Sequence, residues 1–279
     1  MTDDYLIRTM SRAELDRALD WAAIEGWKPG LGDADAFYAA DPAGFFVGLL
    51  AGEPVASISL IAYDAQFSFL GLYIVRPAYR GKGLGLKLWQ EALARHGTPL
   101  VGLDGVVAQQ DNYKKSGFHL AYRNIRYGGA VPGKPSARLV AADTAPFEQL
   151  LAYDREFFPA PRPAFLRRWI KPADGKALVA IDDGRLTGFG VIRACLEGLK
   201  IGPLYAESER IAEELLIALA ATARGDTIYL DVPAPNKAAI RLAERHGMKP
   251  VFETARMYTR TAPDLPLSRL YGVTSFELG

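Results

Sequence analysis

The sequence predicts an α/β (α+β) protein made of two tandem lobes, each a mixed, mostly antiparallel sheet flanked by helices. Its 279 residues are enough for about two domains. Hydrophobic residues make up 49% and charged residues 23%, which is typical of a folded chain and unlike a disordered one. The order of strand and helix patterns in the first half recurs in the second half, and this repeat predicts the two lobes.

Apolar periodicity assigns the elements of the first lobe, residues 1–130. Ser11 and Glu14 have the spacing of a capping box, which starts a helix that runs to about Ile24. Short turns between three apolar runs predict an antiparallel meander. The expected elements are a strand at 6–10, helices at 12–24 and 34–40, strands at 44–50, 54–63 and 67–75, a helix at 84–96 with a 3-4 apolar stripe, a strand at 100–104, a short helix closed by Gly117 and a strand at 119–127.

The second lobe, residues 137–279, follows a linker rich in glycine and proline at 128–136. Each half has a Leu-Asp pair followed by a glycine that closes a helix, and the spacing suggests that the first copy lost about one helical turn. These pairs are Leu103-Asp104 with Gly117-Phe118, and Leu230-Asp231 with Gly247-Met248. The expected elements are a strand at 137–142, two helices within 146–170, strands at 176–182, 185–193 and 198–205, a helix at 209–224, a strand at 227–231, a helix at 236–248, a strand at 250–260 and a closing strand at 272–278.

Charge and composition narrow the range of functions. The 33 basic and 32 acidic residues give a formal charge of +1, so nucleic acid is not an expected partner. The single cysteine, Cys195, cannot form an internal disulfide and is expected to be a small core residue. Because the first residues lack a signal-like apolar run and no apolar stretch reaches 18 residues, we expect a cytoplasmic chain without membrane contact. The scattered His96, His119 and His246 predict no metal site.

One loop carries most of the chemical information. Residues 72–89 run from a strand to a helix through Gly81, Gly83 and Gly85, with Arg80 and Lys82 among them. Alternating glycines let backbone amides point inward, and a helix N-terminus adds unpaired N–H groups and partial positive charge. A pyrophosphate is the natural ligand of such a nest. The spacing fits neither the P-loop GxxxxGK[ST] nor the Rossmann turn GxGxxG.

Residues 75–85 resemble the acyl-CoA signature, R/Q-x-x-G-x-G/A, of the GNAT superfamily of N-acetyltransferases. Arg80, Gly83 and Gly85 stand at its fixed positions. The element order over about 5–127 also resembles that fold, and the second half resembles it without the signature. The string WAAIEGWKPG is similar to that of a bacterial GNAT subgroup with such a second lobe. The resemblance therefore implies tandem GNAT-like lobes.

The resemblance implies acetyl-CoA as co-substrate. Its pyrophosphate would lie on the backbone amides of the signature loop, and its pantetheine arm would run along strand 67–75, where this strand and strand 100–104 diverge. The Val75 amide would stabilise the oxyanion that forms from the thioester carbonyl. The implied contact residues are Tyr73, Ile74, Val75, Arg80, Gly81, Lys82, Gly83, Leu84 and Gly85.

The resemblance also implies that Tyr113, four residues before Gly117-Phe118, is the catalytic acid. A phenol with a pKa near 10 protonates a thiolate with a pKa near 8.5 only at a cost of about 2 kcal/mol. We therefore expect Tyr113 to donate a hydrogen bond to the sulfur, with aromatic packing as the alternative. An asparagine that binds pantetheine in relatives corresponds to Gln109 or to Val106, depending on the direction of counting.

A base is needed because an alkyl amine with a pKa near 10.4 is only about one part in a thousand neutral at pH 7. Strand 67–75 has no carboxylate, so the candidates are Asp104 and Glu25. Their alternative roles are a helix cap and a solvated helix end. Asp64 is expected to serve a hairpin turn. Since the only cysteine lies in the second half, we expect direct transfer in a ternary complex.

The second lobe is expected not to bind coenzyme A. Its loop at 200–212 lacks the two signature glycines and carries Glu207 and Glu209, and Ala243 stands where the first lobe has Tyr113. We expect this lobe to wall the acceptor pocket. The expected function is transfer of an acetyl group from acetyl-CoA to a primary amine of a small molecule. A non-enzymatic acyl-CoA sensor and a peptide or protein N-acetyltransferase are the alternatives.

Overall fold

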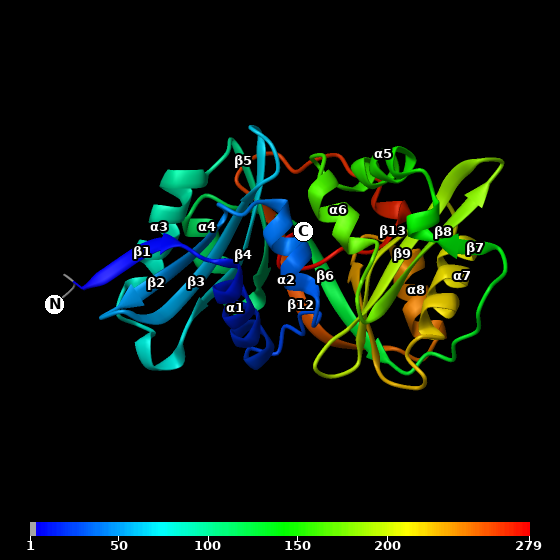
Figure 1. Ribbon diagram of the computed structural model, residues 1–279, viewed down its shortest axis with the longest axis horizontal. Helices are drawn as coiled ribbons and strands as arrows, with labels where there is room; N and C mark the ends of the chain where they lie inside the picture. Colours follow the sequence, from blue (N-terminus) through cyan, green and yellow to red (C-terminus); the bar gives the residue numbers. More distant parts are fainter. Residues whose placement is uncertain (1–3) are drawn as a thin grey trace.

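The computed structural model describes residues 4–279, and both halves contain the same succession of elements (Figure 1). The first half contains β1 (Tyr5–Thr9), α1 (Arg12–Ile24), α2 (Asp33–Ala40), β2 (Phe45–Leu50), β3 (Glu53–Ala62), β4 (Phe67–Val75), α3 (Leu84–His96), β5 (Leu100–Val106), α4 (Gln110–Lys115) and β6 (His119–Gly129). The second half contains β7 (Leu139–Ala141), α5 (Phe147–Phe157), α6 (Pro163–Trp169), β8 (Gly175–Asp182), β9 (Arg185–Ala194), β10 (Leu199–Ala206), α7 (Glu209–Ala220), β11 (Ile228–Pro233), α8 (Lys237–Arg245) and β12 (Lys249–Tyr258), followed by β13 (Leu270–Gly272). The repeat read from the sequence is confirmed.

Local signals in the sequence set the element ends. The capping box is present, because the Ser11 side chain accepts from the Glu14 amide and the Glu14 carboxylate accepts from the Ser11 amide at 2.8 Å. Within the described chain, no helix is long and apolar enough to cross a membrane. Cys195 is buried, as expected for a core residue, and burial raises the pKa of its thiol.

The last strands of the two halves are exchanged. Among the described residues the strand order is β1-β2-β3-β4-β5-β12-β6-β11-β10-β9-β8-β7, so β12 lies between β5 and β6, and β6 lies between β12 and β11. When each strand of the first half is matched with its equivalent in the second, with β6 equivalent to β12, the order reads the same from either end of the sheet. The sequence predicts a sheet for each lobe, whereas the structure fuses the two into one. In Figure 1, β6 and β12 cross the middle of the molecule.

Two buried ion pairs join the exchanged strands at equivalent positions. Asp104 of β5 is the cross-strand neighbour of Arg256 on β12, and Asp231 of β11 is the neighbour of Arg126 on β6. The nitrogen–oxygen distances are 2.6 and 2.9 Å in the first pair and 2.6 and 2.8 Å in the second. The Leu-Asp pairs repeated in the sequence therefore mark two equivalent contacts between the halves.

The halves also meet through helices. α2 packs on α6, where the rings of Phe37 and Trp169 stack with centroids 5.9 Å apart. Both residues belong to a hydrophobic cluster that contains buried side chains from each half. The lobes are therefore joined by a shared core as well as a shared sheet.

The closing segment, residues 270–279, returns from the second half to the first. β13 ends at Gly272, where the predicted closing strand at 272–278 begins, so that prediction misplaced the strand. β13 pairs with β10, and the Val273 amide donates to the Asp231 carbonyl of β11 at 2.9 Å. Figure 1 shows the red chain passing from β13 to the C label at the middle of the molecule.

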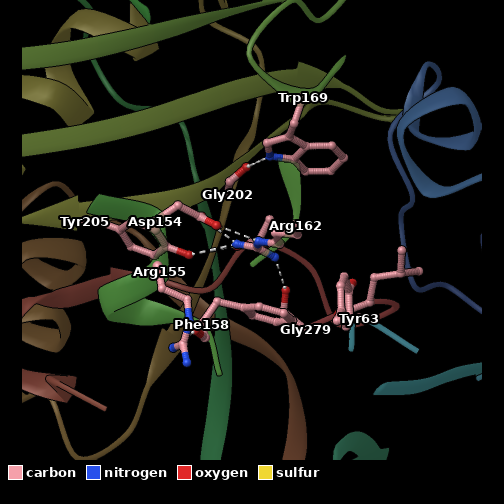
Figure 2. A network of polar contacts seen from close by, with 11 residues as sticks. Tyr63, Asp154, Arg155, Phe158, Arg162, Trp169, Gly202, Tyr205 and Gly279 are labelled. Atoms are coloured by element: carbon pink, nitrogen blue, oxygen red, sulfur yellow. Dashed lines mark hydrogen bonds and ion pairs between the residues drawn. The ribbon is translucent and has the colours of Figure 1, made fainter. Parts of the chain in front are cut away.

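Two side chains anchor the far end of the closing segment. The Arg162 guanidinium donates to the Thr274 hydroxyl at 2.8 Å and to the Gly279 carbonyl at 3.2 Å, and its charge is balanced by Asp154 at 2.8 Å (Figure 2). The Tyr63 hydroxyl, from the turn between β3 and β4, donates to the Leu278 carbonyl at 2.9 Å. The segment is thus fixed against both halves.

Candidate functional site

Two left-handed glycines shape the loop between β4 and α3. Gly81 has a φ of +75° and Gly83 has a φ of +76°, a region that residues with a Cβ rarely adopt. Gly85 is needed for another reason: a Cβ there would lie 2.7 Å from the Tyr73 hydroxyl and 2.8 Å from a Val75 methyl group. The first two glycines therefore turn the chain, and the third lets α3 approach β4.

Backbone amides at the start of α3 are available to an anion. In the part of the chain that the structure describes, the amides of residues 81–86 donate to no protein acceptor, whereas the Lys87 amide donates to the Gly83 carbonyl at 3.1 Å. The Arg80 amide, which the sequence places in the same nest, donates to the Pro77 carbonyl at 3.3 Å instead. Free amides at a helix N-terminus suit a pyrophosphate. The amides available to a pyrophosphate are therefore those of residues 81–86.

A gap opens beside β4 where its pairing with β5 stops. Phe67–Leu70 pair in parallel with Leu100–Leu103, and β4 then continues to Val75 without this neighbour. A bulge bends β4 at this point: Leu72 has a φ of +46°, and the Ser57 hydroxyl donates to its carbonyl at 2.8 Å. The expected divergence of the two strands is present.

The main chain of Val75 faces the gap. The Arg76 amide donates to the Val55 carbonyl of β3 at 3.0 Å, and alternation along an antiparallel strand then turns the polar groups of Val75 to the other edge. The Val75 carbonyl accepts from Arg80 Nε at 2.8 Å, which leaves the Val75 amide as the donor. Ile74 is paired with Ser57 on β3, so its main chain is directed away from the gap.

An outer groove runs from the signature loop along β4 to α4. It is lined by nine of the ten predicted cofactor contacts, and also by Glu25 and Tyr113. Lys82 is not among the residues that line it, and its ammonium lies 5.3 Å from the centre of the Tyr79 ring. The predicted contacts that line the groove are Tyr73, Ile74, Val75, Arg80, Gly81, Gly83, Leu84, Gly85 and Gln109.

An inner pocket continues from the outer groove and shares Trp27, Tyr73, Val106 and Tyr113 with it. Its other walls come from both halves of the chain. The first half supplies Leu70, Gly71, Leu72, Leu103 and Asp104, and the second half supplies Phe252 and Thr254 of β12 with Phe276 and Glu277 of the closing segment. Sequence reasoning missed all four second-half residues. The one available signal was a single acid in the otherwise uncharged run GVTSFEL.

Tyr113 lies where the outer groove meets the inner pocket. Its ring stacks on Trp89 with centroids 5.7 Å apart and lies so close to Gly105 that a Cβ there would be 2.4 Å from it. Burial, with a smaller effect from Tyr73, raises the pKa of Tyr113 to about 12. Proton transfer to a thiolate with a pKa near 8.5 would then cost about 5 kcal/mol. The hydroxyl is suited to donate a hydrogen bond.

Asp104 is fully occupied by its ion pair. Its Oδ1 accepts from Arg256 Nε at 2.9 Å and from Asn124 Nδ2 at 2.8 Å, and its Oδ2 accepts from the Arg256 guanidinium at 2.6 Å. Burial raises the pKa of Asp104, and Arg256 and Asn124 oppose that shift. β5 continues to Val106, so Asp104 lies within the strand and does not cap a helix. The contacts favour a structural role over that of a base.

The other candidate base, Glu25, and the turn residue Asp64 are not among the residues that line the inner pocket. Glu25 follows α1 and forms an ion pair with Arg80 in the outer groove, at the end that suits a phosphate. This position favours holding Arg80 in place over accepting a proton from an amine. Asp64 accepts from the amides of Gln66 and Phe67, both at 2.8 Å, and so serves the turn as expected.

Two family models match the chain, one described as acetyltransferase (GNAT) family over residues 12–118 and one as acetyltransferase (GNAT) domain over residues 150–272. The chain is also 32% identical over 265 residues to holothin acyltransferase from Pseudoalteromonas sp. (strain SANK 73390), with 93% of this chain and 90% of that protein covered. The chain belongs to the GNAT acetyltransferase family. It is thus an acyltransferase with two GNAT domains.

Solved structures share the GNAT fold. The crystal structure of a candidate acetyltransferase from Pyrococcus horikoshii superposes with a TM-score of 0.83 at 23% identity, covering 99% of this chain and 96% of that one. A tandem GNAT protein from the clavulanic acid biosynthesis pathway superposes with a TM-score of 0.62 at 15% identity, covering 93% and 100%. The predicted tandem arrangement of GNAT lobes is therefore confirmed.

The second GNAT domain fills its own gap with the closing segment. β10 pairs with β11 at Leu199–Ile201, and β10 then pairs with β13 at Leu204 and Tyr205. Asn236, the N-cap of α8, donates to the Leu270 carbonyl of β13 at 3.0 Å. Gln109 is the N-cap of α4, so the structure aligns Asn236 with Gln109 and not with Val106.

Proposed function

We propose that this GNAT protein transfers an acetyl group from acetyl-CoA to the primary amine of a small molecule, directly and without an acyl-enzyme. The observation that carries the proposal is the continuity of two cavities. The outer groove has free amides at one end that suit a pyrophosphate, and it leads past Val75 and Tyr113 into the inner pocket, whose walls are largely apolar.

The backbone and side-chain groups of the site have separate roles in this proposal. The free amides of residues 81–86 bind the pyrophosphate, and the edge of β4 left open by β5 receives the pantetheine arm. The Val75 amide stabilises the negative charge on the thioester oxygen. Tyr113 donates a hydrogen bond to the departing sulfur, which suits a hydroxyl that stays protonated at neutral pH.

The inner pocket favours a small acceptor over a peptide or a protein. Residues of the closing segment, Phe276 and Glu277, wall the pocket on the side of the second domain. Their segment is fixed by Arg162 and Tyr63, so the wall is part of the folded structure. The name of the relative from Pseudoalteromonas, holothin acyltransferase, supports a small-molecule acceptor as well.

A panel of small amines, each incubated with the protein and acetyl-CoA while free thiol is measured, tests the proposal. We expect thiol release that depends on one class of amine, with the mass of that amine raised by one acetyl group. An acyl-CoA sensor would be favoured if calorimetry shows that acetyl-CoA binds but the acetyl group is transferred neither to any small amine nor to a peptide with a free N-terminus. Acetylated peptides without acetylated small amines would favour the third alternative.

A further inference from the structure

Glu277 is a buried carboxylate whose hydrogen-bonding capacity is unused. Its side chain is 1% exposed, and neither carboxylate oxygen has a hydrogen-bond partner among the described residues. The nearest cation is the ammonium of Lys200, at 3.8 Å, which is equally buried and also lacks a hydrogen-bond partner. Buried charged groups in proteins are nearly always hydrogen-bonded, so an unpartnered carboxylate calls for an explanation.

The backbone places Glu277 beside the bend in β4. Its carbonyl oxygen lies so close to Gly71 that a Cβ on Gly71 would be 1.9 Å from it. Gly71 immediately precedes Leu72, at the bulge that bends β4 away from β5. The next residue, Leu278, is held by Tyr63 and by the Ser275 hydroxyl, which accepts from the Leu278 amide at 3.0 Å. Glu277 is therefore fixed at the point where the gap begins.

Glu277 is one of the residues that line the same inner pocket as Tyr113. The rest of that pocket is largely apolar, with the side chains of Trp27, Phe252 and Phe276 among its walls. Of the acidic groups that line it, Asp104 is bound through both oxygens by Arg256, whereas Glu277 has both oxygens free. Of the two carboxylates among the described residues that line the inner pocket, only that of Glu277 accepts no hydrogen bond and could therefore accept one from a protonated amine.

We propose that Glu277 of the second domain is the catalytic base for the first and accepts a proton from the primary amine of the acceptor. This inference rests on the proposed function. The carboxylate accepts one proton from the protonated amine, the nitrogen lone pair so freed forms the N–C bond at the thioester carbonyl, the C–S bond breaks, and the nitrogen releases its second proton to solvent. The sulfur leaves as a thiolate that accepts a hydrogen bond from Tyr113 and takes its proton from solvent.

Other titratable groups surround the Glu277 carboxylate, so the pH dependence of the reaction rate reflects all of them together. Lys200 lies on β10, Arg126 on β6, Asp104 on β5, Tyr73 on β4 and Tyr113 on α4. Arg126 and Asp104 are held in their own ion pairs. The pH profile of a single Glu277 variant, compared with wild type, isolates the contribution of Glu277.

Glu277→Gln, which keeps the shape and removes the base, is the test, with Glu253→Gln as matched control in an exposed ion pair with Arg123. We expect kcat at pH 7 to fall by about 100-fold or more, with an unchanged KM for acetyl-CoA. The rate of the variant should rise roughly tenfold per pH unit toward the pKa of the amine, because only neutral amine reacts, while wild type rises less. Glu253→Gln should behave as wild type.

Two further measurements keep the test decisive. If Glu277→Gln does not fold because Lys200 loses its partner, the double variant with Lys200→Met removes both charges and should show the same loss. A kcat within about threefold of wild type, or a lost kcat with the wild-type pH profile, would overturn the assignment. Wild type is assayed first with the same amines: no transfer by wild type refutes the proposed function, whereas transfer that survives Glu277→Gln refutes only this inference.

Discussion

Removing the charge of Asp104 separates a structural role from a catalytic one. In Asp104→Asn, Arg256 loses the carboxylate that accepts two of its hydrogen bonds, at 2.9 and 2.6 Å, and remains as a cation whose side chain is 4% exposed. Leaving one member of a buried ion pair without its partner costs about 3–5 kcal/mol. We expect the free energy of unfolding, measured by urea denaturation, to fall by this amount.

Asp231→Asn is the matched control, because Asp231 pairs with Arg126 at 2.6 and 2.8 Å in the same way and does not line the inner pocket. Both variants should lose similar stability, and the folded fraction of Asp104→Asn should keep kcat within about threefold of wild type. Wild-type stability in Asp104→Asn together with a kcat that falls by about 100-fold would make Asp104 the base and refute this reasoning.

Three further outcomes are expected. Tyr113→Phe should lower kcat by about tenfold or more and leave the acetyl-CoA affinity measured by calorimetry unchanged. Because the pKa of Tyr113 is raised to about 12, ionisation of this phenol should not lower the kcat of wild type below about pH 11. Equal turnover in both proteins would exclude the donor role. Gly83→Ala, at a φ of +76°, should cost about 1 kcal/mol and weaken acetyl-CoA binding, whereas Gly184→Ala, at a φ of +75° in the turn between β8 and β9, should cost stability alone. Arg8 lowers the pKa of Glu14 to about 2, below the unfolded value near 4.3. The stability advantage of wild type over Glu14→Gln should therefore shrink as the pH falls from about 5 to 2. A difference in thermal stability between the two proteins that stays constant over this pH range would contradict the expectation.

Most elements could be predicted because their signals are local. Ser11 and Glu14 define a helix start within four positions, and three apolar runs with short turns define the meander. The exchange of β6 and β12 could not be predicted in this way. A strand that pairs with its own lobe and one that pairs with the other lobe carry the same alternating pattern. Because the two Asp–Arg pairs stand at equivalent positions, the arginines do not reveal the exchange either.

The cofactor side of the site was predictable for the same reason, since Gly81, Gly83 and Gly85 lie in one short loop that sets its own geometry. The acceptor side was not, because its walls come from segments more than 150 positions apart. Glu277 reaches the inner pocket only through the path of the closing segment. The sequence makes Asp104 a candidate base because it stands beside the predicted gap, whereas its repetition as Asp231 favours a structural role, and both residues form a buried ion pair.

The exchanged strands have a consequence for how the chain is made. Arg256 meets Asp104 from 152 positions further along the sequence, and both sheet neighbours of β6 lie in the second half. A nascent chain that has emerged only as far as β6 therefore cannot complete its sheet, and β5 is left with an open edge that could join another molecule. The native neighbours of β5 and β6 are therefore present only after β11 and β12 have been synthesised.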